Sequence, residues 1–104
     1  MNYQDILYEP LGPVVRISHN RPAKRNAESE NLLAELDDAL ARAARDDAIR
    51  VAILAATGDH FSAGHDLHDG QAKRGGYSPD QHWLWEHEHY LGNALRIWDF
   101  PKPT

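Results

Sequence analysis

The fold is decided by one short stretch, Val51-Ala52-Ile53-Leu54-Ala55-Ala56-Thr57-Gly58-Asp59. Its first six residues are apolar without interruption, and the last three are polar or turn-forming residues that end the run. An apolar run of this length is typical of a strand that is buried on both faces in a parallel sheet covered by helices. We therefore expect a buried parallel strand at residues 51–56.

The residues before this strand predict a hairpin and a helix. Residues 6–8 and 14–18 are rich in apolar and β-branched side chains, and turn-forming residues separate them. Ser29 is expected to cap a helix in which leucine and alanine recur at helical spacing between residues 32 and 43. The order of strand, helix and strand indicates an α/β layer.

The residues after the strand predict a loop and a second helix. Residues 60–76 contain four glycines and are expected to form mostly loop. Pro79 and Pro101 bracket a helical pattern at residues 80–98. We expect the buried face of this helix to carry Trp83, His87, Tyr90, Leu91, Ala94 and Trp98.

Composition excludes several classes of protein. The 104 residues favour one domain, and 11 Lys and Arg against 16 Asp and Glu give a formal charge of −5, which argues against a nucleic-acid partner. The absence of cysteine excludes disulfide scaffolds, thiol catalysis and zinc fingers. No apolar run approaches the roughly 18 residues of a membrane span, and the first residues lack a secretory pattern. We expect a cytoplasmic protein without a membrane partner.

The stretch Phe61-Ser62-Ala63-Gly64-His65-Asp66-Leu67 carries the candidate chemistry. A glycine after a buried strand lets another molecule approach the backbone, because Gly64 has no Cβ. If a helix follows, its first amides lack partners and can hold negative charge that develops on a carbonyl oxygen. The alternative is an ordinary turn that uses glycine for its geometry alone, and these residues by themselves favour that alternative.

Five segments, in this order, resemble the N-terminal portion of the enoyl-CoA hydratase/isomerase, or crotonase, family. They are His19-Asn20-Arg21-Pro22-Ala23-Lys24-Arg25-Asn26-Ala27, the leucine-rich helix, Arg50-Val51-Ala52-Ile53-Leu54, residues 61–67 and Pro101-Lys102-Pro103. The resemblance extends from about Val14 to Thr104. It implies an α/β fold, the front part of a crotonase-type spiral of ββα units. Residues 1–104 would then be the N-terminal part of a single, incomplete domain.

The resemblance also implies an enzyme that acts on acyl-CoA thioesters and stabilises an enolate-like oxyanion with two backbone N–H groups. One of these groups is the amide of His65, whose imidazole is not required. The positions that match the CoA and pantetheine path are Ala23, Lys24, Arg25, Ala27, Ala63, Asp66 and Leu67. The plainer alternative for Lys24 and Arg25 is that they are solvated loop charges. No metal is expected, and no cofactor other than the CoA of the substrate. The parent enzyme, meaning the longer protein of which residues 1–104 would be the N-terminal part, is expected to be a homotrimer or hexamer.

Two positions depart from the family pattern. Glu28 stands where relatives carry a bulky apolar residue near the acyl pocket, and His65 stands where alanine is common. Glu28 indicates either an unusual acyl group or a loop that is turned differently. The imidazole of His65 could alter acyl preference while its backbone role is retained.

The family's second oxyanion amide and its two catalytic glutamates match no position in this sequence, and Glu86 and Glu88 are not their equivalents. We therefore expect the parent to be a hydratase (a lyase) or isomerase of enoyl-CoA, and the isolated fragment to be inactive. Thioester hydrolysis and dehalogenation in the same family use this front half equally. The alternative from another class is a non-catalytic remnant that binds CoA or a partner.

The helix at residues 80–98 offers a weaker pattern. His82 and His89 could share a face with Glu86, and histidines three or four residues apart on a helix can bind zinc. No third ligand has a clear spacing, so we expect these to be ordinary helix or pocket residues. Trp83 or Tyr90 could border an aromatic or branched acyl group, although aromatic side chains on such a helix are more often core.

Overall fold

A β-hairpin opens the chain in the computed structural model, which describes residues 2–104. β1 (Ile6–Leu11) and β2 (Val14–His19) are antiparallel, and Gly12 turns between them with a φ of 66°, a conformation that glycine adopts freely. β3 (Val51–Ala56) pairs parallel with β2, so the strand order is β1-β2-β3. The predicted hairpin and parallel strand are confirmed.

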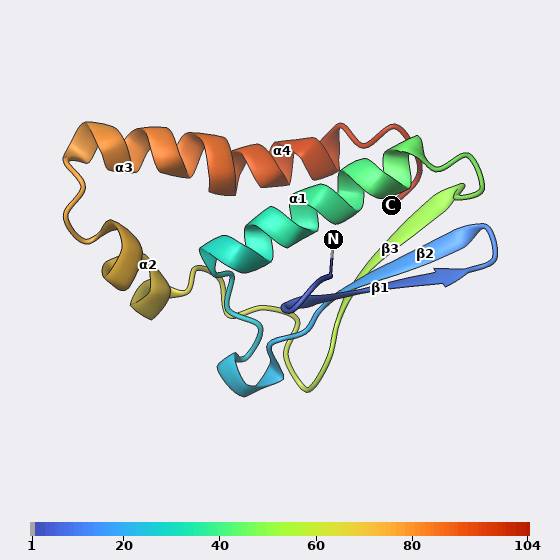
Figure 1. Ribbon diagram of the computed structural model, residues 1–104, viewed down its shortest axis with the longest axis horizontal. Helices are drawn as coiled ribbons and strands as arrows, with labels where there is room; N and C mark the ends of the chain where they lie inside the picture. Colours follow the sequence, from blue (N-terminus) through green and yellow to red (C-terminus); the bar gives the residue numbers. More distant parts are fainter. Residues whose placement is uncertain (1) are drawn as a thin grey trace.

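The predicted burial of β3 on both faces is wrong. Ala52 is fully buried, but Ile53 on the opposite face is 45% exposed. Within residues 2–104, helix α1 (Glu30–Arg45) covers the sheet, and it does so on one face (Figure 1). The apolar run therefore forms a strand with one open face.

α1 (Glu30–Arg45) covers the sheet and forms the core with it (Figure 1). It begins where predicted, because the Ser29 side chain accepts a hydrogen bond of 3.1 Å from the Leu32 N–H. Its buried face packs on the side chains of Ile6, Val15, Ile17 and Ala52. Burial of this amphipathic face, more than helix propensity, holds the helix in place.

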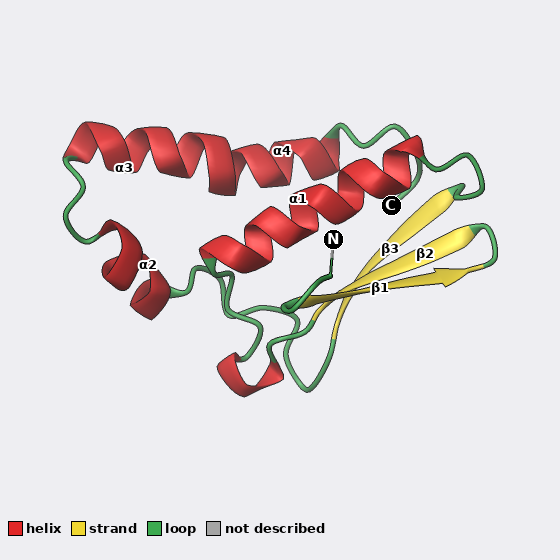
Figure 2. Cartoon of the chain, viewed as in Figure 1, coloured by secondary structure: helices red, strands yellow, loops and turns green. Residues whose placement is uncertain are grey.

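The C-terminal part of the chain is helical. α2 (Leu67–Arg74) precedes a continuous rod made of α3 (Pro79–Trp85), the π-type segment η2 (Glu86–Leu91) and α4 (Gly92–Trp98) (Figure 2). The rod lies against α1, so α1 is sandwiched between it and the sheet (Figure 1). No helix within residues 2–104 combines the length and the apolar character needed to cross a bilayer.

The prediction for residues 60–76 is confirmed in part, because nine of these seventeen residues lie outside helices, but α2 at residues 67–74 was not predicted. The predicted buried face of the rod is wrong, since Trp83 and Trp98 are 63% and 86% exposed, whereas Trp85 and Asn93 are buried. A π-turn takes one more residue than an α-turn, so η2 rotates the face that the rod presents to α1.

Candidate active site

Asn26 anchors the loop between β2 and α1. Its buried side chain donates to the carbonyl oxygens of Thr57 and His60 at 2.8 and 2.7 Å and accepts from the Arg21 N–H at 2.8 Å. Arg25 and Asn26 have φ values of 52° and 55°, in the left-handed region that asparagine enters more readily than arginine. The loop, which includes the 3-10 turn Pro22–Lys24, is thereby fixed against the segment that follows β3.

Residues 62–66 run beside this loop. Glu28 and His65 form an isolated parallel bridge, in which the Glu28 N–H donates to the Gly64 carbonyl at 2.7 Å and the Asp66 N–H donates to the Glu28 carbonyl at 3.1 Å. Gly64 has a φ of 91°, and a Cβ built there would meet nothing within 4 Å. Glycine is therefore required by the backbone conformation and not by crowding.

The amide of His65 is an unused donor in this segment. The Ala63 N–H donates to the Arg25 carbonyl and the Gly64 N–H to the Ser62 hydroxyl, each at 3.0 Å. The bridge geometry directs the His65 N–H away from its bridge partner, and no group among residues 2–104 accepts a hydrogen bond from it. A free amide of this kind can stabilise an oxygen on which negative charge develops.

A hollow of about 490 Å³ opens beside residues 65–69. Its lining includes Lys24, Ala27, His65, Asp66 and Leu67, which are five of the eight positions predicted for the site. The other three predicted positions, Ala23, Arg25 and Ala63, do not border the hollow. The contacts of all eight with CoA stay predictions.

The sequence analysis did not include Arg21 among the site residues, although Arg21 contacts both segments that line this hollow, the loop before α1 and the segment that leads into α2. Its guanidinium lies 2.9 Å from the Asp66 carboxylate and also donates to the Ala27 carbonyl. Asp66 in turn caps α2, accepting from the Asp69 N–H at 2.9 Å. This backbone hydrogen bond, helped by Arg21, lowers the pKa of Asp66 although burial opposes the shift. The signal in the sequence was the position of Arg21 in a loop dense in basic residues.

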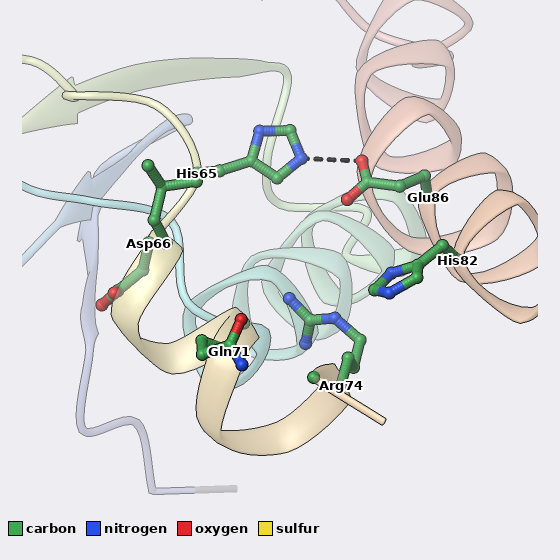
Figure 3. Close-up of a pocket in the computed structure, with 9 residues that line it drawn as sticks. His65, Asp66, Gln71, Arg74, His82 and Glu86 are labelled. Atoms are coloured by element: carbon green, nitrogen blue, oxygen red, sulfur yellow. Dashed lines mark hydrogen bonds and ion pairs between the residues drawn. The ribbon is translucent and has the colours of Figure 1, made fainter. Parts of the chain in front are cut away.

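The His65 imidazole belongs to a polar cluster that the sequence analysis did not assemble. Its Nε2 lies 2.7 Å from the Glu86 carboxylate (Figure 3), and its ring stacks on Tyr90 with centroids 3.5 Å apart. Burial raises the pKa of the Tyr90 phenol, and the carboxylates of Glu28 and Glu86 raise it further. Both Glu86 and Tyr90 lie in the π-type segment η2, whose helical phase has no signal in the local sequence.

Three histidines of the rod lie beside aromatic rings. The ring centroids are within 6 Å in the pairs Tyr77 with His82, Trp83 with His87, and Trp85 with His89. Of these three pairs, Trp83 with His87 is stacked and the other two are tilted. Within residues 2–104, no three histidine or acidic side chains are grouped so that they could hold a metal ion. All three histidines are exposed, and their role as ordinary helix or pocket residues stays a prediction.

Solved structures define the class of the fold. An enoyl-CoA hydratase/isomerase from Xanthobacter autotrophicus Py2 superposes with a TM-score of 0.90 at 33% identity, covering 99% of this chain and 38% of that one. An enoyl-CoA hydratase/isomerase (crotonase) structure from Legionella pneumophila gives a TM-score of 0.86 at 35% identity, covering 96% of this chain and 38% of that one. The fold is therefore the front part of a crotonase fold.

Sequence comparison gives the family. The profile of the enoyl-CoA hydratase/isomerase family matches residues 11–104, and the chain belongs to that family. EchA13 of Mycobacterium tuberculosis is 41% identical over 83 residues, which are 77% of this chain and 26% of that protein. The 1,2-epoxyphenylacetyl-CoA isomerase of Escherichia coli is 33% identical over 91 residues, 88% of this chain and 34% of that protein. The chain thus spans about a quarter to a third of these two relatives.

Proposed function

We propose that this site binds an acyl-CoA thioester, with CoA in the hollow beside Lys24 and the thioester oxygen on the His65 N–H. One observation carries the proposal: the His65 amide is free, whereas the amides of Ala63, Gly64 and Asp66 are all hydrogen-bonded. Family membership supports it, because relatives carry the names of enoyl-CoA hydratases and of CoA-ester isomerases.

The chemistry that this amide supports is formation of a thioester enolate. When a nucleophile adds to an enoyl thioester, or a base removes an α-proton, negative charge accumulates on the thioester oxygen. A fixed N–H stabilises that charge more in the transition state than in the ground state, and one such donor is typically worth a factor of about 10²–10³ in rate. Hydration and isomerisation both pass through this enolate, so both belong to the proposal.

Proton transfer requires an acid and a base as well as the amide. The resemblance to the family assigns its catalytic glutamates to no position within residues 1–104, and the chain spans about a third of the length of its relatives. We therefore expect residues 1–104 alone to bind the thioester and not to turn it over. A trimeric or hexameric, cytoplasmic parent enzyme is part of the same proposal.

The test is a calorimetric titration of the 104-residue chain with crotonyl-CoA. Saturable binding should weaken in Lys24→Ala and stay unchanged in Arg45→Ala, which removes the same charge from the exposed far end of α1. Amide NMR provides the second readout, because acetoacetyl-CoA, whose enolate carries a full charge, should shift the His65 N–H more than free CoA does.

Two outcomes would contradict the proposal in different ways. A folded chain that gives no heat with either CoA ester does not bind the substrate class at all. Equal weakening in both charge variants, or a His65 amide that does not respond to acetoacetyl-CoA, would indicate a CoA-binding module without an oxyanion site.

A further inference from the structure

A second cavity, of about 210 Å³, adjoins the site. Leu36, Leu54, Phe61 and Ile97 contribute apolar walls, and Glu28 and Tyr90 contribute polar groups. Pockets that enclose a whole drug-sized ligand measure roughly 300–1,000 Å³, so this cavity suits one short end of a molecule. An apolar cavity with a few convergent polar groups is the usual form of a specificity pocket.

Glu28 connects this cavity to the His65 amide. Its backbone is hydrogen-bonded on both sides to the segment that contains His65, through the Gly64 carbonyl and the Asp66 N–H. Its side chain borders the second cavity, while the preceding residue, Ala27, borders the CoA hollow. A thioester whose oxygen lies on the His65 amide therefore has Glu28 close to its acyl carbons.

The other polar groups of the cavity are engaged. The Asn93 side chain donates to Asp37 at 2.8 Å, and the His19 Nδ1 lies 3.4 Å from the Phe61 carbonyl. The Glu28 carboxylate has only a long contact of 3.3 Å with the Ser62 hydroxyl, besides its interaction with Tyr90. Its remaining lone pairs can accept a hydrogen bond from a ligand.

We propose that Glu28, supported by Tyr90, selects acyl-CoA thioesters whose short acyl chain carries a hydroxyl group; this inference rests on the proposed function. A hydroxyl donates to the carboxylate and replaces the water that binding expels. A plain alkyl chain leaves the remaining acceptor sites of the carboxylate desolvated and without a donor, which is costly in an apolar cavity. A site built to hydrogen-bond a hydroxyl rejects the analogue that lacks it far more strongly than an apolar pocket rejects an added group.

The test compares two ligands that differ only in that hydroxyl. The full chain is titrated with 3-hydroxybutyryl-CoA and with butyryl-CoA, and the ratio of their dissociation constants is measured. We expect the hydroxylated ester to bind at least about tenfold more tightly. Glu28→Leu should abolish or reverse this ratio, whereas Glu88→Gln, on a carboxylate that is 75% exposed, should preserve it.

Glu28→Gln serves as the second variant, because it keeps the shape and the contact with Ser62 and removes the charge. It should retain part of the preference, and circular dichroism shows whether each variant is folded. Equal binding of the two esters to the wild-type chain, or a preference that survives in Glu28→Leu, would overturn this inference and leave the proposed function intact. A folded chain that binds neither ester overturns the proposed function, and the inference with it.

Discussion

Gly64 combines a φ of 91° with open space around its missing Cβ. Gly64→Ala should therefore destabilise the chain by about 1–3 kcal/mol through backbone strain, with no steric clash, and should also displace the His65 amide. Urea unfolding measures the first effect and crotonyl-CoA titration the second. Gly76→Ala is the matched control, since a Cβ there meets nothing within 4 Å and the φ of Gly76 is not in the left-handed region. Equal destabilisation by both substitutions would mean that Gly64 is not strained.

Asp66 makes stability depend on pH in the acid range. Its pKa is lower in the folded chain than in the unfolded chain, where it is about 3.9, so its ionised form stabilises the fold at neutral pH. This contribution is lost as pH falls from about 4 through the folded pKa. Asp66→Asn keeps the cap acceptor of α2 and should flatten the decline in urea midpoint between about pH 5 and pH 2.

A matched variant separates charge from capping at this position. Asp66→Ala removes the cap as well as the ion pair with Arg21, so it should cost about 1 kcal/mol more than Asp66→Asn at neutral pH. Asp59→Asn, on an exposed residue after β3, should leave the acid decline unchanged. An unaltered decline in Asp66→Asn would show that other carboxylates govern acid unfolding.

At the scale of elements, α1 depends on one cap. Ser29 is 5% exposed, and its hydroxyl oxygen accepts from the Leu32 N–H at the start of the helix that builds the core. Ser29→Ala should destabilise the chain by about 1 kcal/mol, while Ser29→Thr, which retains an acceptor, should cost less. Thermal or urea unfolding followed at a helical wavelength gives both values, and equal losses would assign the effect to packing instead of capping.

Elements with a local pattern could be predicted from the sequence, and elements fixed by distant contacts could not. The cap and the leucine spacing of α1 predict that helix from the sequence. α2 has eight residues, of which only Arg74 is buried, so it has no apolar pattern that would predict it. Arg74 is held by Glu30, 44 residues earlier, which no local window contains. In the candidate site, Gly64 identified the His65 amide, but the contacts of Glu86 and Tyr90 with His65 depend on the helical phase that the π-turn sets.

At the scale of the whole molecule, the two edges of the sheet differ. β1 carries Pro10, which has no N–H to donate to an added strand, and the charged Glu9. β3 is apolar along its length, and Ile53 is 45% exposed on its open face. Within residues 2–104 only the Pro103 carbonyl, which accepts from the Ala52 N–H at 3.0 Å, pairs with its outer edge. Edges of this kind favour pairing with another chain.

We therefore expect the isolated chain to self-associate through β3 at high concentration. Ile53→Lys places a charge on the open face of that strand, so it should reduce association without lowering the free energy of unfolding. Leu7→Lys is the matched control, because Leu7 is 37% exposed on β1, where Pro10 already protects the edge. Sedimentation velocity over a range of concentrations distinguishes the two variants. If both lysine substitutions suppress association equally, net charge and not the β3 edge controls association. A wild-type chain that stays monomeric at every concentration would show that the β3 edge is already protected.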